Sequence, residues 1–294
     1  MYPRISTSKF LLCAQRRRAA GPGKAALIIL CLLTLSTPLT AKPLPSADVV
    51  RKIEMRRGLW VNLQATLKMD FTTPQGKKAS CRAELVYDRL DEKILLKGFN
   101  DKSEPLFVFK TDDRNFELYL PRQNTVFSGS IFDLEDSPEI HSHLKALDLY
   151  RSLKPMALPL EKTTADEDQG LTRLEIRGAK GKERALYANA EGDTVKEVYY
   201  RKDGMPKTLV ERSNFKPVKK GKRGAFSFPE DIRIESYPSA SAGAGRGTNE
   251  TRLKFVNAEF SPLNSQAFDF VFPENARRAD IGGEFKKQQA LASR

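Results

Sequence analysis

A strict alternation between apolar and polar side chains constrains the fold of this 294-residue chain more than any other feature. From Leu59 to Phe71 every odd-numbered residue is apolar, and after Trp60 every even-numbered residue is polar. Successive side chains of a β-strand point to opposite faces of the sheet, so a period of two places all the apolar residues on one face. The run therefore predicts a long strand with one buried face and one face in water.

Shorter runs of the same kind follow, separated by polar turns. We expect further strands at 79–88, 93–99, 105–110, 115–120 and 125–131, and a second series at 171–177, 184–190, 194–201, 207–213, 226–237, 251–260 and 267–272. Asp203-Gly204, between two of them, is typical of a tight hairpin turn. Short strands joined by polar turns indicate an antiparallel meander, and hence a single, mainly β domain with a few helices over residues 42–275.

Two segments have helical periodicity instead. Residues 48–58 carry apolar side chains at 49, 50 and 53 and end at a glycine, which predicts a short N-terminal helix. Residues 137–153 begin with Ser-Pro and repeat apolar side chains at helical spacing, which predicts a helix that interrupts the strands. We interpret the acidic segment 163–170 as a turn and residues 276–294 as a flexible polar tail.

Residues 1–41 have the three parts of a secretory signal. Six basic residues and no acidic residue precede the apolar run 25–35, and Ala41 supplies a small residue at its exit. We expect cleavage near Ala41 and a mature protein in the periplasm. An uncleaved anchor is the alternative, but a membrane span needs roughly 20 apolar residues and Pro38 ends this run early. Cys31 lies inside the apolar run with no small residue before it, so we expect no lipid anchor.

Without the leader the chain carries 44 basic and 37 acidic residues, a net charge of +7. The two signs are interspersed, whereas a nucleic-acid-binding protein concentrates basic residues on one face, so we expect no nucleic-acid partner. The densest basic run, 216–224, lies between turn residues. Two interpretations of this run stay open: a solvated loop, or a transient contact with anionic lipid at a membrane surface.

Side chains that carry catalysis are scarce. His141 and His143 are the only histidines, and two positions apart on a helix they point in nearly opposite directions, so they cannot share a metal ion. In an extended segment they would lie on one face, but no third ligand is near them in the sequence. Cys81 is the only cysteine beyond the leader, and its place in an alternating segment predicts a small core residue and not a reactive thiol. The paired carboxylates fall in predicted turns. We therefore expect no enzymatic activity, no metal ion and no cofactor.

Several segments, in this order, resemble the outer-membrane lipoprotein carriers of the LolA/LolB-like superfamily. They are Glu-Leu-Val-Tyr-Asp-Arg at 84–89, Asp-Arg-Asn-Phe-Glu-Leu-Tyr-Leu-Pro at 113–121, Val-Phe-Ser-Gly-Ser at 126–130, and the closing segments at 253–264 and 268–273. The resemblance extends over residues 46–275, most of the mature chain. It implies a curved antiparallel sheet that forms an open half-barrel, lidded by helices, with an apolar cavity on its concave face.

The resemblance also implies the residues of that cavity. Its lining on the strands would be Leu63, Leu67, Met69, Leu85, Tyr87, Phe107, Phe109 and Phe127, and the lid would add Leu144, Leu147 and Tyr150. In the family an arginine at the end of an early strand holds the lid shut by hydrogen bonds, and Arg89 occupies that position. Leu90 replaces the proline that often follows this arginine, so the loop departs from the family pattern.

The function that the resemblance implies is carriage of lipoprotein acyl chains, or of another lipid, towards the outer membrane. Transfer partners at the inner and outer membranes would then be expected for a protein that works as a monomer. The alternative is a structural or interaction module of the envelope, with a filled core and a protein partner. An exported hydrolase is a third class, for which the sequence offers few catalytic side chains.

Overall fold

The computed structural model describes residues 46–112, 114–131, 152–153, 158–159, 162–179, 181–219, 225–237, 247–264 and 266–281. All of them belong to one compact unit, Pro43–Arg294. The predicted leader at 1–41 lies outside the described residues, as does the predicted helix at 137–153 apart from its last two residues, which are helical.

Within the described ranges, fourteen strands form one sheet in the order β14-β6-β5-β4-β3-β2-β1-β13-β12-β11-β10-β9-β8-β7. Their bounds are β1 Asn62–Thr72, β2 Lys78–Asp88, β3 Lys93–Phe99, β4 Pro105–Thr111, β5 Asn115–Leu120, β6 Thr125–Ser130, β7 Thr163–Asp168, β8 Leu171–Gly178, β9 Gly181–Ala188, β10 Thr194–Tyr200, β11 Pro206–Lys219, β12 Ala225–Ser236, β13 Asn249–Glu259 and β14 Arg277–Asp280. A single turn of 3-10 helix, Pro121–Gln123, links β5 to β6. The predicted strand series are thus confirmed, apart from the segments discussed below.

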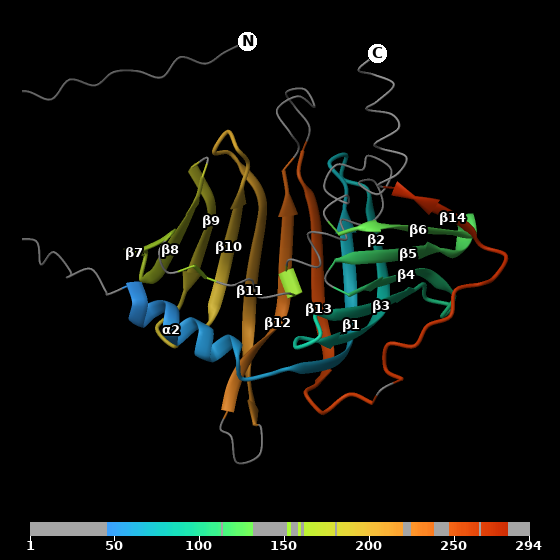
Figure 1. Cartoon of the computed structure of the whole chain (residues 1–294), viewed down its shortest axis with the longest axis horizontal. Helices are drawn as coiled ribbons and strands as arrows, with labels where there is room; N and C mark the ends of the chain where they lie inside the picture. The colour runs from blue at the N-terminus through green and yellow to red at the C-terminus, as the bar shows by residue number, and fades with distance from the viewer. Residues whose placement is uncertain are drawn as a thin grey trace, which may run out of the picture. The chain divides into compact units, whose positions relative to one another are not determined.

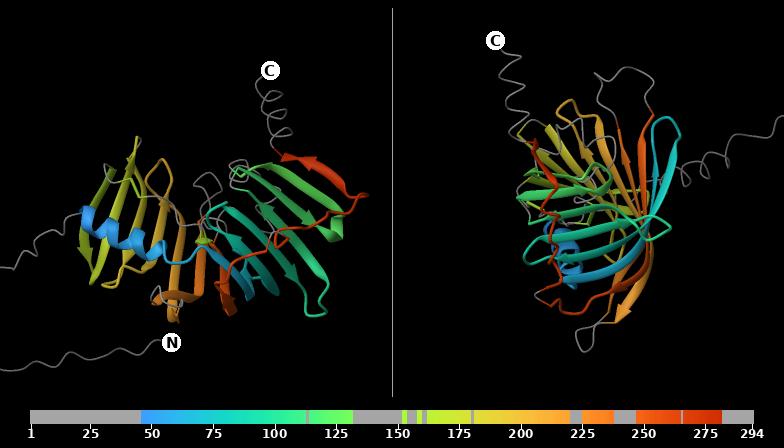
Figure 2. Two further views of the ribbon diagram at one scale, coloured as in Figure 1. Left: turned by 60° about the horizontal axis from the view of Figure 1, so that its bottom comes forward. Right: turned by 90° about the vertical axis from the view of Figure 1, so that its right-hand side faces the viewer.

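Strand β1 joins two meanders into one sheet. It pairs antiparallel with β2 on one side and with β13 on the other, so the first series, β1–β6, continues into the second, β7–β13. Strands β4–β6 run almost across the direction of β10–β13 (Figure 1), as the right-handed twist of strands accumulates across the sheet. The sheet is curved (Figure 2) and does not close, because β7 and β14 stand at its two ends. This confirms the predicted open, curved antiparallel sheet.

The predicted N-terminal helix is confirmed as α2, Ser46–Arg57. It crosses the strands of the second meander on the concave side of the sheet (Figures 1 and 2). Val50 and Ile53, three residues apart, lie on the same helical face and are buried against residues of β8 and β9. Lys52 and Arg56 donate hydrogen bonds to the carbonyl oxygens of Ala190 and Glu191, which fastens the helix to the β9–β10 turn.

The composition of the acidic segment 163–170 predicted a turn, but most of the segment forms a strand. Residues Thr163–Asp168 form β7, and only the last two residues turn into β8. Acidic residues are poor strand formers in a sheet interior, but among the described strands β7 is the last of the sheet and pairs with β8 alone. Charged side chains suit such an edge because they discourage pairing with another chain.

Two expectations near the C-terminus were wrong. Residues 267–272 form no strand: Phe270 and Phe272 pack edge-to-face on each other, and Phe272 packs on Tyr119, without a backbone ladder. The segment interpreted as a flexible tail begins with strand β14, which pairs in parallel with β6. Ala279 of β14 and Ile281, the residue just after the strand, are buried in the main core. These two apolar side chains therefore hold the strand in place. Residues 282–294 lie outside the described part.

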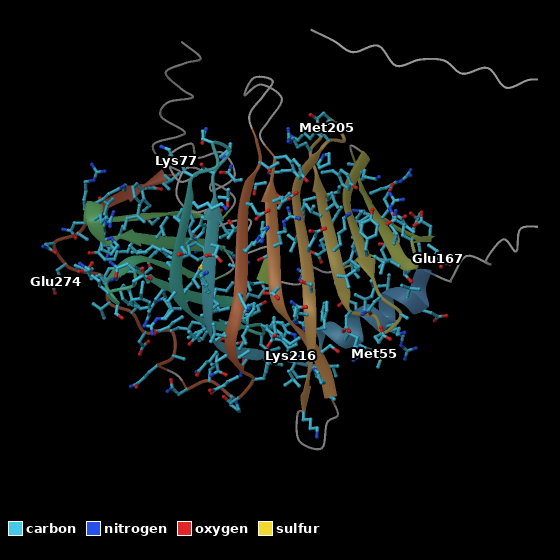
Figure 3. All side chains as sticks on the ribbon, turned by 180° about the vertical axis from the view of Figure 1, so that it is seen from behind. Met55, Lys77, Glu167, Met205, Lys216 and Glu274 are labelled. Atoms are coloured by element: carbon cyan, nitrogen blue, oxygen red, sulfur yellow. The ribbon has the colours of Figure 1, made fainter. Side chains whose placement is uncertain are left out.

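The basic run 216–224 is only partly the loop that was expected. Its first four residues belong to β11, which continues to Lys219 and pairs along its length with β12. Figure 3 places Lys216 towards one end of β11 and Met205 at the turn before its other end. Lys216 forms an ion pair with Glu230 on β12. Residues 220–224 lie outside the described residues.

Candidate functional site: the concave face of the sheet

The register of the strands places the predicted lining residues on one face. Leu63 lies opposite Tyr87, and Leu67 opposite Ala83, so the apolar phase of β1 matches that of β2. The same phase continues across β3 to β6. The eight predicted lining residues on the strands are all buried, none with more than 8% of its surface exposed: Leu63, Leu67, Met69, Leu85, Tyr87, Phe107, Phe109 and Phe127. The predicted lid residues Leu144, Leu147 and Tyr150 lie outside the described part of the chain.

An open pocket lies on this face, beside the C-terminal end of α2. Its empty volume is about 700 Å³, including space open to solvent. Its wall is formed by α2, the start of β1 and the segment between them, the strands from β10 to β12 with the turn before β10, and two residues that precede β7. The lining residues are Arg56, Trp60, Leu63, Ser152, Leu153, Gly192, Asp193, Thr194, Glu197, Arg212, Phe215, Ser227, Phe228, Pro229 and Ile232. Of the eight predicted lining residues on the strands, Leu63 alone is among them. The other seven belong to the apolar core next to it.

Trp60 forms one wall of this pocket. Gly58 ends α2, and its amide donates to the carbonyl of Glu54, so the chain turns from the helix into β1 at this point. The indole of Trp60 then packs edge-to-face on Tyr87 and Phe228, with ring centroids 5.6 and 6.0 Å apart. The tryptophan thereby connects the core of the first meander with the pocket wall of the second. It is also the only tryptophan of the chain.

The opposite part of the pocket wall is polar, which the sequence reasoning missed. Glu197 on β10 and Arg212 on β11 point to the concave side, and their carboxylate and guanidinium lie 3.6 Å apart. Only 2% of the Glu197 side chain and 12% of the Arg212 side chain are exposed. Tyr199 donates its hydroxyl to Glu197 over 3.0 Å, and Arg212 donates to the carbonyl of Ser152 over 2.9 Å. The sequence did contain an indication of this pair, because both charged residues occupy strand positions whose side chains point to the concave face.

Burial dominates the chemistry of the ionisable groups on this face. It raises the pKa of the Tyr199 hydroxyl, and the negative charge of Glu197 raises it further, so the phenol stays protonated. Burial also raises the pKa of the Cys81 thiol to about 11, with a smaller contribution from Asp70. The Cys81 thiol is therefore neutral at physiological pH, in agreement with its interpretation as a small core residue.

Arg89, the predicted latch, follows β2 directly. Its amide donates to the carbonyl of Val61 over 2.9 Å, which fixes the backbone beside the first strand. The next residue, Leu90, is 78% exposed, and Asp88 accepts the amides of Leu90 and Asp91 to close the turn. Nη1 of Arg89 is buried and has no hydrogen-bond partner among the residues that the structure describes. A buried donor of this kind costs free energy until an acceptor reaches it.

The outer face of the sheet is different in character. Arg233 on β12 donates to Glu250 over 2.8 Å, lies 3.2 Å from Glu211 and also pairs with Glu235. On β8, Glu175 accepts from Lys182 and two arginines. Such ion pairs suit a surface in contact with water, whereas the concave face offers apolar contact area.

No group of three or more His, Cys, Asp or Glu side chains that could hold a metal ion occurs in the described part of the chain. His141 and His143 lie outside it. Among the described helices, none is long and apolar enough to cross a membrane.

The fold matches solved structures whose sequences differ widely from this one. A LolA superfamily protein from Nitrosomonas europaea superposes with a TM-score of 0.52 at 12% identity, over 76% of this chain and 97% of that one. A domain from Vibrio parahaemolyticus, described as an outer membrane lipoprotein-sorting protein domain, superposes with a TM-score of 0.52 at 15% identity, over 76% and 95%. A DUF1329 family protein from Desulfovibrio piger gives a TM-score of 0.53 at 12% identity, over 76% and 95%.

By sequence alone, no family model and no curated protein matches the chain. The predicted resemblance to the LolA/LolB-like superfamily is therefore confirmed at the level of the fold, by the superpositions and by the single curved, open sheet.

Proposed function

We propose that this protein is a periplasmic carrier that shelters acyl chains of a lipoprotein, or of another lipid, on its concave face for transfer towards the outer membrane. The observation that carries the proposal is the open pocket beside a continuous apolar core, on the concave side of a sheet whose other face is charged. The LolA-like fold is in keeping with this role.

The free energy of lipid transfer explains why such a pocket is needed. Each methylene removed from water contributes about 0.8 kcal/mol, so a chain of ten methylenes left in water would cost roughly 8 kcal/mol. A protein that covers the chain with Trp60, Leu63 and Phe228 removes most of this cost. It does so without catalysis, and the function requires neither a metal ion nor a cofactor.

The proposed cavity is larger than the pocket that is open now. Leu67, Met69, Leu85, Tyr87, Phe107, Phe109 and Phe127 are already buried, so a ligand reaches them only after the groups that cover them move aside. In this proposal Arg89 controls that movement, because its buried Nη1 is a donor that a covering segment can satisfy. Leu144, Leu147 and Tyr150 remain the proposed lid residues.

The experiment is mass spectrometry of organic extracts of the protein purified from its native envelope. We expect a lipid that copurifies with the wild type and is lost from Leu63→Asp, which puts a charge into the pocket wall. Gln64→Asp, one residue along β1 and on the outer face, is the matched control and should keep the lipid. Extracts of the folded wild type without lipid would contradict the proposal.

A structural module with a filled core is the competing function. It is favoured by the complete burial of residues such as Phe109 and Met69, which are 0% exposed. In that case the protein would bind a protein partner, and lipid would be absent from both the wild type and the Leu63→Asp extracts.

A further inference from the structure

The pocket has an apolar side and a polar side, and the polar side has hydrogen-bonding capacity that the described residues do not use. Nη2 of Arg212 is committed to Glu197 and to the carbonyl of Ser152. Nη1 of Arg212 and Oγ1 of Thr194 are buried and have no partner among the described residues. Both residues belong to the pocket wall. Two unsatisfied polar groups in one wall are costly, and an acceptor brought by a ligand would relieve the cost.

The charges around these groups restrict the kind of acceptor. The pocket wall contains two cations, Arg56 and Arg212, and two carboxylates, Asp193 and Glu197. Arg212 is already paired with Glu197, and the other arginine and the other carboxylate of the wall also balance in charge, so the wall has no excess positive charge to hold an anion. A ligand carboxylate would also lie beside the carboxylate of Glu197 in a site of low polarity. An uncharged acceptor fits this wall better than a charged one.

We propose that the polar side of the pocket is a subsite for the carbonyl group of an acyl ester or amide. Resting on the carrier function proposed above, this assigns esterified or amidated acyl chains as the preferred ligand class, ahead of free fatty acids. Thr194 and Arg212 donate to the carbonyl oxygen, while the hydrocarbon lies against Trp60, Leu63 and Phe228. Both donor atoms are buried, so the carbonyl oxygen reaches them only if a neighbouring side chain of the pocket wall moves aside.

The test is a competition titration, in which three compounds with the same acyl length displace a fluorescent fatty acid from the protein. The compounds are a fatty-acid methyl ester, the corresponding alkyl methyl ether, which lacks the carbonyl, and the free fatty acid. We expect the ester to bind about ten-fold tighter than the ether, the ratio that one buried hydrogen bond supplies. The free acid should bind more weakly than the ester above its pKa.

Two variants assign the effect to the two donors. Thr194→Val keeps the shape of the side chain and should remove most of the preference for ester over ether. Arg212→Lys keeps a positive charge beside Glu197 but removes Nη1, and should do the same. Thr66→Val, on the outer face of β1, is the control and should retain the preference.

Equal affinities for ester and ether in the wild type, or tighter binding of the free acid, would overturn the subsite while leaving the carrier function intact. Failure of all three compounds and of the fluorescent fatty acid to bind would overturn both proposals.

Discussion

At the scale of single residues, the concave face depends on close fits between neighbouring strands. Gly98 on β3 lies opposite Phe107 on β4, and a β-carbon at this glycine would stand 2.2 Å from the ring of Phe107. That ring is buried and cannot move away at low cost. The glycine is therefore required by close packing, and its backbone conformation is not the reason.

We predict that Gly98→Ala lowers the free energy of unfolding by roughly 1–3 kcal/mol, the usual cost of overpacking a core. Gly178→Ala is the matched control. A β-carbon there would meet the carboxylate of Glu183, the far end of a flexible side chain that can swing aside. Urea denaturation followed by circular dichroism measures both. Equal destabilisation by the two substitutions would contradict the packing argument.

Arg89 gives a second test at this scale. If it holds the lid, Arg89→Leu changes how long the protein retains a bound lipid while the far-UV circular dichroism spectrum stays the same. Arg82→Leu, on the preceding strand β2 and with a half-exposed side chain, is the control. Dissociation of a fluorescent fatty acid after dilution is the measurement. Identical dissociation rates in Arg89→Leu and the wild type would rule out the latch.

At the scale of elements, the sequence predicted strands best where one face is apolar and the other is polar. Strand β3 was predicted with its observed bounds, because its neighbours Arg89–Glu92 and Asn100–Ser103 are strong turn formers. Strand β7 was missed since its acidic residues lie at the edge of the sheet, and only the pairing with β8 shows that they form a strand. Residues 267–272 alternate like a strand, yet their aromatic rings pack without pairing. The local pattern of apolar and polar residues carries no information about these tertiary contacts.

The same limit applied to the site. Alternation identified the apolar face, but the pairing of Glu197 with Arg212 depends on which strands become neighbours. Sequence reasoning had assigned the inward phase to apolar residues only. A pair of opposite charges at the inward phase of two consecutive strands was the signal that could have indicated a buried polar site.

Strand β14 can be tested as an element. Its parallel pairing with β6 is short, so we expect the burial of Ala279 and Ile281 to hold it. Ile281→Ala should cost roughly 2–5 kcal/mol, as for other buried isoleucines, and should increase hydrogen exchange of the β6 amides. Asp280→Asn, whose side chain is exposed, is the control. Unchanged exchange in β6 for Ile281→Ala would show that β14 does not protect this edge.

The β8–β9 hairpin predicts a dependence of stability on pH. Lys182 holds the pKa of the Glu175 carboxyl below its ordinary value of 4.5, and Arg177 and Arg173 lower it further. A lowered pKa stabilises the fold above the unfolded-state value, and this contribution is lost as pH falls through the folded-state value. The wild type should therefore be more stable than Glu175→Gln at neutral pH, and the difference should shrink as the pH falls below the ordinary carboxyl value of 4.5. Glu167→Gln on β7 controls for the change in net charge. A difference that does not depend on pH would contradict this assignment.

At the scale of the whole molecule, the sheet has a charged outer face, a buried apolar face and a pocket between α2, β1 and the second meander. The single tryptophan, Trp60, lies in the wall of that pocket, so its fluorescence reports directly on what enters. Bromine atoms on an acyl chain quench tryptophan fluorescence only at contact distance. A fatty acid brominated along its chain therefore tests whether hydrocarbon occupies the pocket itself.

Titration of the wild type with a brominated fatty acid, below its critical micelle concentration, is the most direct measurement. The account predicts quenching of Trp60 that saturates at a fixed ratio of lipid to protein and is reversed by an excess of the unbrominated fatty acid. An absence of quenching in the folded protein, or quenching that rises without saturation, would contradict an acyl chain held on the concave face.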